Sequence, residues 1–318
     1  MLESAQELAG RIAEGYRAVA SQWAGARATV DTTVSQVNAA ADRIAAMNRQ
    51  IRDALASGRS ANELIDQRDL LAQNVARMVG GRANVEADGT MTVRVDGNAL
   101  VSGADARHLA VSGPTSIDSG ERVSIAWEGA TGFPVAITAG ELGGTLAVLA
   151  PEGEGGELAQ VAAAYNSVAT ALADRVNAQH HAGATASGAP GGDFFAVAAT
   201  GPAALGLTVV PTSAAQLALA RPGSGAYDAT NADAMSQIGA SDGSPDAIWA
   251  DQVLRFGVAT AGAVQRARLS ETAAVTATTS QQSVAAVDGD EETVTLLTYQ
   301  AAYQASARVI SAIDEALD

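Results

Sequence analysis

Histidine is the residue of this chain best suited to acid–base or metal chemistry, and only three are present: His108, His180 and His181. The last two are adjacent, and consecutive residues of a helix point about 100° apart, so they cannot easily share one metal ion. We expect them at an exposed helix end, where an imidazole complements the negative end of the helix dipole. His108 lies far from this pair in the sequence. The histidines therefore predict no metal site.

An acidic cluster near the end of the sequence, with carboxylates at positions 288, 290, 291 and 292, is the second place where chemistry could occur. Such a cluster could bind a cation weakly. Carboxylates also stabilise the first turn of a helix through its dipole. Because a helical pattern follows directly, we interpret the cluster as a helix start.

The chain lacks most of the residues and motifs on which enzymes rely. It has no cysteine, which excludes disulfides, thiolate nucleophiles and thiolate zinc sites. All nineteen basic residues are arginine, so Schiff bases and lysine-dependent phosphate loops are excluded as well. The sequence contains no HExxH and no phosphate-cradling loop. We predict a protein that is not an enzyme, with no catalytic residues and no bound cofactor or metal.

Composition also limits the partners. At 318 residues the chain can bury a substantial core and form two or three domains. Its formal net charge of −16 and its scattered arginines disfavour nucleic acid and anionic membranes as partners. The sequence has no apolar run long enough for a membrane span, and it does not open with a secretory signal pattern. We therefore expect no nucleic acid, no membrane and no cleavable signal peptide.

The elements that position these residues begin with a long helix. Six apolar residues lie seven apart over the first fifty positions: Tyr16, Trp23, Val30, Val37, Ile44 and Ile51. Mostly small residues occupy the positions three further on. This spacing predicts a coiled-coil-like helix about 70 Å long whose apolar stripe faces a partner helix. The stripe could be the inner face of a bundle, or it could be a surface that also binds another chain. The two interpretations are compatible.

A shorter helix and a β segment follow. Ser60 and Glu63 match a capping box, which predicts a second helix from Ser60 to Gly80-Gly81. The apolar pattern then changes to a period of two, with tight turns predicted at Asp88-Gly89 and Asp96-Gly97. Short strands are expected to continue as far as Phe133–Ile137. Residues 82–138 thus predict a small antiparallel β domain.

Helical patterns return after this segment. A helical pattern is predicted from residue 141 to the histidine pair, kinked or interrupted at Pro151 and residues 152–156. Another long helix is predicted from Ser244-Pro245, where the serine caps and the proline occupies the first turn, to a break at residues 288–290 before the last helix. Between them, residues 191–231 predict a short β or irregular insertion, which could pack with the β domain. Phe194 and Phe195 are expected to form a hydrophobic plug between the helical and β parts, with contact to a partner as the alternative.

The end of the sequence carries a second apolar stripe. It recurs every four residues at Leu297, Ala301, Ala305, Val309 and Ile313. This spacing places the side chains on one face of a helix. No stop pattern follows the stripe, so we expect the sequence to be a trimmed piece of a longer chain. Together with the stripe of the first helix, these positions are our candidate helical packing residues.

The predicted fold class is α+β, a discontinuous, rod-like bundle of long helices that carries small inserted antiparallel β domains. The helical bundle domain is assigned to residues 1–81, 139–190 and 232–318. The β domain takes residues 82–138, and the short insertion takes residues 191–231.

Five stretches of the sequence resemble, in order, the family of the bacterial flagellar hook-associated protein 1, the first hook–filament junction protein. They are SANELIDQRDLLAQNVARMVGGRANVEADGTMTVRVDG, GELGGTLAVL, DRVNAQHHAG, GGDFF and the closing run that contains YQAAYQASARVI. The chain departs from the family in two ways. Its outer β region after GGDFF is reduced, and the family's terminal segments are missing. The resemblance thus covers a core that lacks the terminal segments.

The resemblance implies a structural subunit at the hook–filament junction, a mechanical adaptor that acts through helical packing in bacterial motility. The implied partners are the hook protein, the second junction protein, copies of the chain itself, and an export chaperone that binds the C-terminal region. The implied location is extracellular, in the flagellum, after type III flagellar export without a cleavable signal.

An alternative from another class is a secreted hydrolase or a glycan-binding adhesin. Its site would lie on the β insertion, where Glu121 and Glu128 are the carboxylates to test. A groove lined by paired carboxylates would favour this alternative.

Overall fold

The computed structural model describes residues 1–130, 134–225, 227–285 and 289–317. The side chains of residues 284, 285, 289–291 and 309–317 are outside this description. The chain divides into two compact units, Met1–Leu254 and Arg255–Asp318. The finer division into a helical bundle, a β domain and an insertion stays a prediction.

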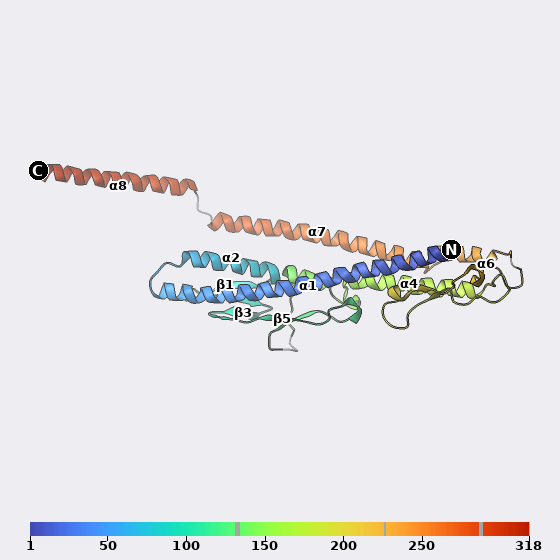
Figure 1. Ribbon diagram of the computed structural model, residues 1–318. Coiled ribbons are helices and arrows are strands. Elements are labelled where there is room, and N and C mark those ends of the chain that lie inside the picture. The colour runs from blue at the N-terminus through green and yellow to red at the C-terminus, as the bar shows by residue number, and fades with distance from the viewer. Residues whose placement is uncertain (131–133, 226, 286–288, 318) are drawn as a thin grey trace. The chain divides into compact units, whose positions relative to one another are not determined.

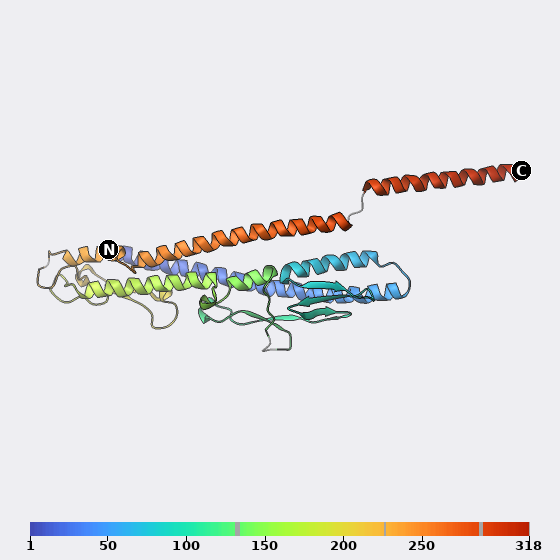
Figure 2. The ribbon, with the colours of Figure 1, turned by 180° about the vertical axis from the view of Figure 1, so that it is seen from behind.

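The helices of the described residues are α1 (Leu2–Ala56), α2 (Asn62–Val79), α3 (Gly140–Val148), α4 (Glu157–His181), α5 (Ala203–Gly206), α6 (Thr230–Ser236), α7 (Pro245–Ala285) and α8 (Gly289–Leu317). Single 3-10 turns lie at η1 (Ile117–Ser119), η2 (Glu152–Glu154), η3 (Ala214–Gln216) and η4 (Ile238–Ala240). Within the first unit, α1 is the central helix, along which the other elements pack. Helix α2 lies beside its C-terminal part and α4 beside its N-terminal part, as both views show (Figures 1 and 2).

Helix α1 ends where the sequence predicts, and α2 does not begin there. Ser57 follows the last residue of α1, and Gly58 adopts a φ of 68°, a left-handed conformation that glycine allows without strain. The capping box predicted at Ser60 is wrong, because α2 begins at Asn62 and its N-cap residue is Ala61, which makes no side-chain cap. Ala61 is buried against Ile51 and its neighbours, so apolar packing fixes this turn.

Eight short strands form three small antiparallel sheets among the described residues. They are β1 (Arg82–Val85), β2 (Met91–Val95), β3 (Asn98–Ser102), β4 (Asp105–Ala106), β5 (Leu109–Ser112), β6 (Ser124–Trp127), β7 (Phe195–Ala196) and β8 (Thr208–Val209). Strands β1 to β4 pair in sequence order, β5 pairs with β6, and β7 pairs with β8. At the β2–β3 turn, Asp96 and Gly97 both have positive φ, which confirms the tight hairpin turn predicted there.

One predicted strand is wrong. Phe133 lies outside the described residues, and residues 134–137 form no strand but a single bridge between Ala126 and Pro134. Proline has no N–H to donate, so it cannot take part in a regular ladder at this position. Ile137 is nevertheless buried in the core.

The core of the first unit follows α1 in two large clusters and the small one at the α1–α2 turn that contains Ala61. One large cluster joins the middle of α1 to α2 and to the inner sides of β2, β3, β5 and β6. The other large cluster joins the N-terminal part of α1 to α4 and to residues 194–217. Because Val34, Ala41 and Asn48 are buried beside the predicted stripe, the buried face of α1 is wider than a coiled-coil seam. The α+β class with long helices and small antiparallel sheets is confirmed.

Candidate helical packing surfaces

The stripe predicted on α1 lies inside the first unit. Tyr16 and Trp23 are 3% and 2% exposed, and Val30, Val37, Ile44 and Ile51 are completely buried. Each large apolar side chain buried in this way stabilises the fold by roughly 1.5–3 kcal/mol. This face of α1 therefore packs against the chain's own helices and sheets. Contact of the same residues with a partner subunit stays a proposal.

The stripe predicted on α8 lies in the second unit and is exposed there. Leu297 is 58% exposed, and Ala301 and Ala305 are exposed as well. The side chains of Val309 and Ile313 lie outside the described residues. Further large apolar side chains on the same helix are also exposed: Val294, Leu296, Tyr299 and Tyr303. Apolar surface gathered on one element in this way is typical of interaction sites.

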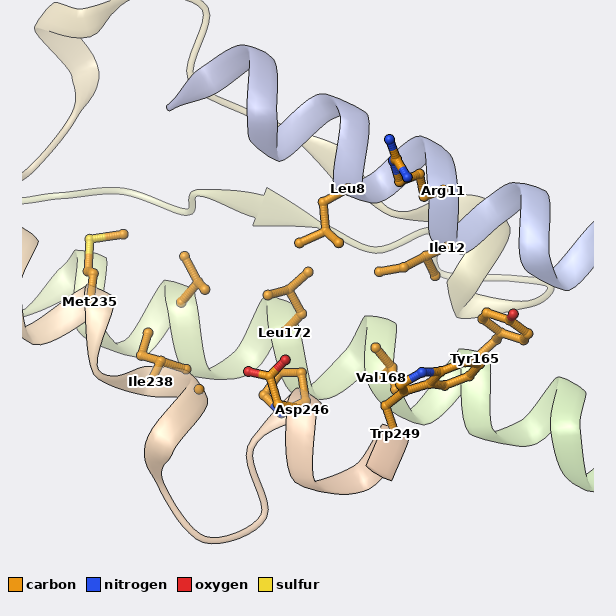
Figure 3. Close-up of a pocket in the computed structure, with 13 residues that line it drawn as sticks. Leu8, Arg11, Ile12, Tyr165, Val168, Leu172, Met235, Ile238, Asp246 and Trp249 are labelled. Carbon is orange, nitrogen blue, oxygen red and sulfur yellow. The ribbon is translucent and has the colours of Figure 1, made fainter. Parts of the chain in front are cut away.

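An apolar cleft of about 450 Å³ lies between α1, α4, the α6–η4 segment and the first turns of α7. Its labelled apolar side chains point toward one another in Figure 3 and include Leu8, Ile12, Val168, Leu172, Met235 and Ile238. Tyr165 and Trp249 close one end with ring centroids 4.9 Å apart. Arg11 is bonded to Glu7 on the surface of α1. The lining offers packing surface rather than a set of convergent catalytic groups.

His180 is buried, so the expectation of an exposed histidine pair is wrong for this residue. It is only 1% exposed, and its ring lies edge-on to Phe194. Nε2 accepts a hydrogen bond from the backbone N–H of Ala218 at 2.9 Å, which leaves Nδ1 to donate to the Gly192 carbonyl at 2.6 Å. His180 thus joins the end of α4 to two loop segments. His181 is half-exposed at the end of α4, as expected, and it also pairs with Asp193 at 2.9 Å, which was not predicted.

Phe194 and Phe195 pack in the cluster formed by α4 and the N-terminal part of α1, and not in the cluster that contains β2, β3, β5 and β6. Asn177 of α4 fixes them, because its Oδ1 accepts from both backbone N–H groups at 2.8 Å. Its Nδ2 donates to the carbonyl of Phe195. The prediction of a plug between the helical and β parts is corrected accordingly.

The carboxylates singled out by the sequence do not form a described site. Position 288 and the side chains at 290 and 291 lie outside the described residues. Among the residues that are described, no group of three His, Cys, Asp or Glu side chains could hold a metal ion. Glu128 hydrogen-bonds to His108, and Glu121 is exposed with its backbone N–H bonded to Ser119.

Sequence reasoning missed a buried polar network between α1, α2 and the first sheet. The Asn48 side chain is fully buried, and it donates to the carbonyls of Met91 and Gly103 and accepts from the Met91 N–H. Arg68, 1% exposed, donates to the Gly89 carbonyl at 2.7 Å and pairs with Asp69. The one hint in the sequence is that Asn48 lies four residues after Ile44, on the buried side of the helix.

These features define an α+β protein, in which long packed helices carry small sheets and buried polar groups hold backbone segments in place. Residues 1–195 match the family described as the flagellar hook-associated protein FlgK helical domain. Residues 281–318 match the C-terminal family of the flagellar basal body rod FlgEFG proteins. The chain belongs to the FlgK family of flagellar hook-associated proteins, which confirms the resemblance read from the sequence.

Individual relatives agree with this assignment. Flagellar hook-associated protein 1 of Escherichia coli (strain K12) is 33% identical over 202 residues, which cover 58% of this chain and 36% of that protein. The Bacillus subtilis (strain 168) protein of the same name is 26% identical over 92% of this chain and 64% of its own length. The structure of the flagellar hook junction protein FlgK from Burkholderia pseudomallei superposes with a TM-score of 0.51 at 28% identity, over 62% of this chain and 36% of that one.

The chain thus spans between about one third and two thirds of the length of these curated relatives. In the part of the chain that the structure describes, no helix combines the length and the apolar character needed to cross a membrane.

Proposed function

We propose that this chain serves as a structural subunit of the bacterial flagellum at the junction between hook and filament. It acts there as a mechanical adaptor, and it works by packing helices against neighbours rather than by catalysis. The family match over residues 1–195 supports this role. The observation that carries it is the exposed apolar stripe on α8, in the segment that also matches the rod-protein C-terminal family.

The neighbours in this proposal are other axial proteins, namely the hook protein and the second junction protein, together with copies of the same chain. Leu297 and the exposed tyrosines of α8 offer the apolar surface for those contacts. Covering an exposed leucine or tyrosine with a partner removes apolar surface from water, which stabilises the complex. The six α1 residues with the seven-residue spacing stiffen the subunit from inside. An export chaperone would use the same C-terminal region before assembly.

The proposal places the protein outside the cell, after flagellar type III export without a cleavable signal. The absence of cysteine suits a chain that crosses a channel unfolded, because it has no thiols that could cross-link on the way. The finished subunit would then refold in the flagellum.

A complementation experiment tests the role. The complete gene product is expressed in a bacterium that lacks its own hook-associated protein 1, and attached filaments are counted by electron microscopy. We expect the wild type to restore attached filaments. The variant Leu297→Asp should restore few, and Gln300→Asp, a change at an exposed polar position of the same helix, should restore as many as the wild type. If the wild type leaves the cells without attached filaments, the proposed role is wrong.

A further inference from the structure

His108 sits between two carboxylates that come from different elements of the first unit. Its Nε2 lies 3.0 Å from Oδ1 of Asp42, on α1. Its Nδ1 lies 3.1 Å from Oε2 of Glu128, directly after β6. The imidazole thus joins the long helix to the β5–β6 hairpin at a position where the ring is about one third exposed.

The backbone holds these three side chains together. His108 directly precedes β5, and its carbonyl accepts from the Glu128 N–H at 2.9 Å, so the two residues are opposite each other at the end of the β5–β6 ladder. One turn before Asp42, Asn38 bonds to both the N–H and the carbonyl of Leu109, each at 2.9 Å. Asn38 and Asp42 lie four residues apart and therefore on one face of α1.

The two contacts of the ring have a consequence for its protonation. An ionised carboxylate only accepts hydrogen bonds, so each ring nitrogen must carry a proton for both bonds to form. A neutral imidazole carries one proton and presents a lone pair to the second carboxylate. We propose that His108, Asp42 and Glu128 form a pH-sensitive clasp that fastens the β5–β6 hairpin to α1 when the ring is doubly protonated and loosens when the ring loses a proton.

The charges around the ring support the clasp. Two carboxylates face the imidazole, Asp42 from α1 and Glu128 from the end of β6. From the segment of His108 itself, Arg107 directs its guanidinium over the ring of Trp127, 4.1 Å from the centroid. The hydrogen bond to Asp42 raises the pKa of His108 above its ordinary 6.5, the bond to Glu128 adds to the rise, and partial burial opposes it.

The sign of the pH effect follows from this shift. The folded protein binds the proton more tightly than the unfolded chain, so the stabilisation by the clasp is fully present below about pH 6.5. It is lost as the pH rises through the raised pKa of the folded state. The amide–backbone bonds of Asn38 do not titrate, so at high pH the hairpin is held by them and by apolar packing.

Amide hydrogen exchange tests the clasp. The measured quantity is the ratio of two protections from exchange, that of the amides Leu109–Ser112 in β5 and that of Met91–Val95 in β2 of the same molecule. Base catalysis speeds exchange in both strands, so it cancels in this ratio. In the wild type we expect the ratio to fall by about threefold or more between about pH 5.5 and about pH 8.5. In His108→Gln the ratio should stay constant, and in the control His181→Gln, which removes the exposed pair with Asp193, it should fall as in the wild type.

An NMR titration of the imidazole supplies the second readout. The pKa of His108 should drop in Asp42→Asn and in Glu128→Gln, each of which keeps the shape of the side chain and removes its charge. Circular dichroism checks that all variants fold. A constant exchange ratio in the wild type, or a fall of the same size in His108→Gln, overturns the clasp, as does a His108 pKa that neither carboxylate variant changes.

Discussion

Replacement of Asn48 by alanine is the most demanding test of the packing between α1 and the first sheet. The side chain is fully buried and makes three short bonds to backbone, two with Met91 at 2.8 and 2.9 Å and one with the Gly103 carbonyl at 2.7 Å. At about 1 kcal/mol for each bond, the loss is about 3 kcal/mol. Asn48→Ala also leaves the N–H and carbonyl of buried Met91 unpaired, which raises the expected loss to about 5 kcal/mol.

The assay is guanidinium chloride unfolding followed by tryptophan fluorescence, since Trp23 and Trp127 are both buried in the same core cluster. We expect the unfolding midpoint to fall while the slope stays the same. The matched control is Asn98→Ala, which removes an exposed asparagine from the same sheet and should change the stability by no more than about 0.5 kcal/mol. If Asn48→Ala costs no more than Asn98→Ala, the buried network does not hold the sheet on α1 and the reasoning is refuted.

Four more substitutions test other parts of the structure. Trp23→Ala should lower the free energy of unfolding by about 3–5 kcal/mol, measured in the same assay, because the ring is 2% exposed; a loss below about 1 kcal/mol would contradict its place in the core. Gly140→Ala should lower the melting temperature, because its φ is 73° and a Cβ would lie 2.7 Å from the Arg77 carbonyl oxygen, whereas Gly144→Ala in open space on α3 should raise it slightly. Burial and the hydrogen bond to Asp118 raise the pKa of Tyr16 above its ordinary 10.0. The stability that this residue contributes is therefore lost as the pH rises above about 10, so stability should fall less steeply there in Tyr16→Phe than in the wild type.

The long helices and their buried faces could be predicted from the sequence because their signals are local. A spacing of seven residues from Tyr16 to Ile51 depends only on helix geometry, and the structure buries every one of these six positions. The start of α7 is equally local. Pro245 begins the helix, and the Ser244 hydroxyl accepts from the Ala247 N–H, as the Ser-Pro pair predicts.

The misplaced His180 and the missed Asn48 network share one physical cause, which is contact between distant parts of the chain. His180 was expected at an exposed helix end, where an imidazole complements the helix dipole, yet it is buried and its Nε2 accepts from the N–H of Ala218, thirty-eight residues away. Asn48 meets Met91 and Gly103 at separations of 43 and 55 residues, which no local pattern encodes. Glu63 and Ser60 have the correct spacing for a capping box, but the burial of Ala61 outweighs the cap.

Chemical labelling of α8 tests the central claim most directly. The chain has no cysteine, so Leu297→Cys places a single thiol on the exposed stripe of this sequence. The rate of its reaction with a maleimide is measured in the isolated protein and in purified flagella that contain the complete gene product. Our account predicts rapid labelling of the isolated protein and strong protection in the flagella, because neighbouring subunits cover the stripe. Equal rates in the two states would contradict the account.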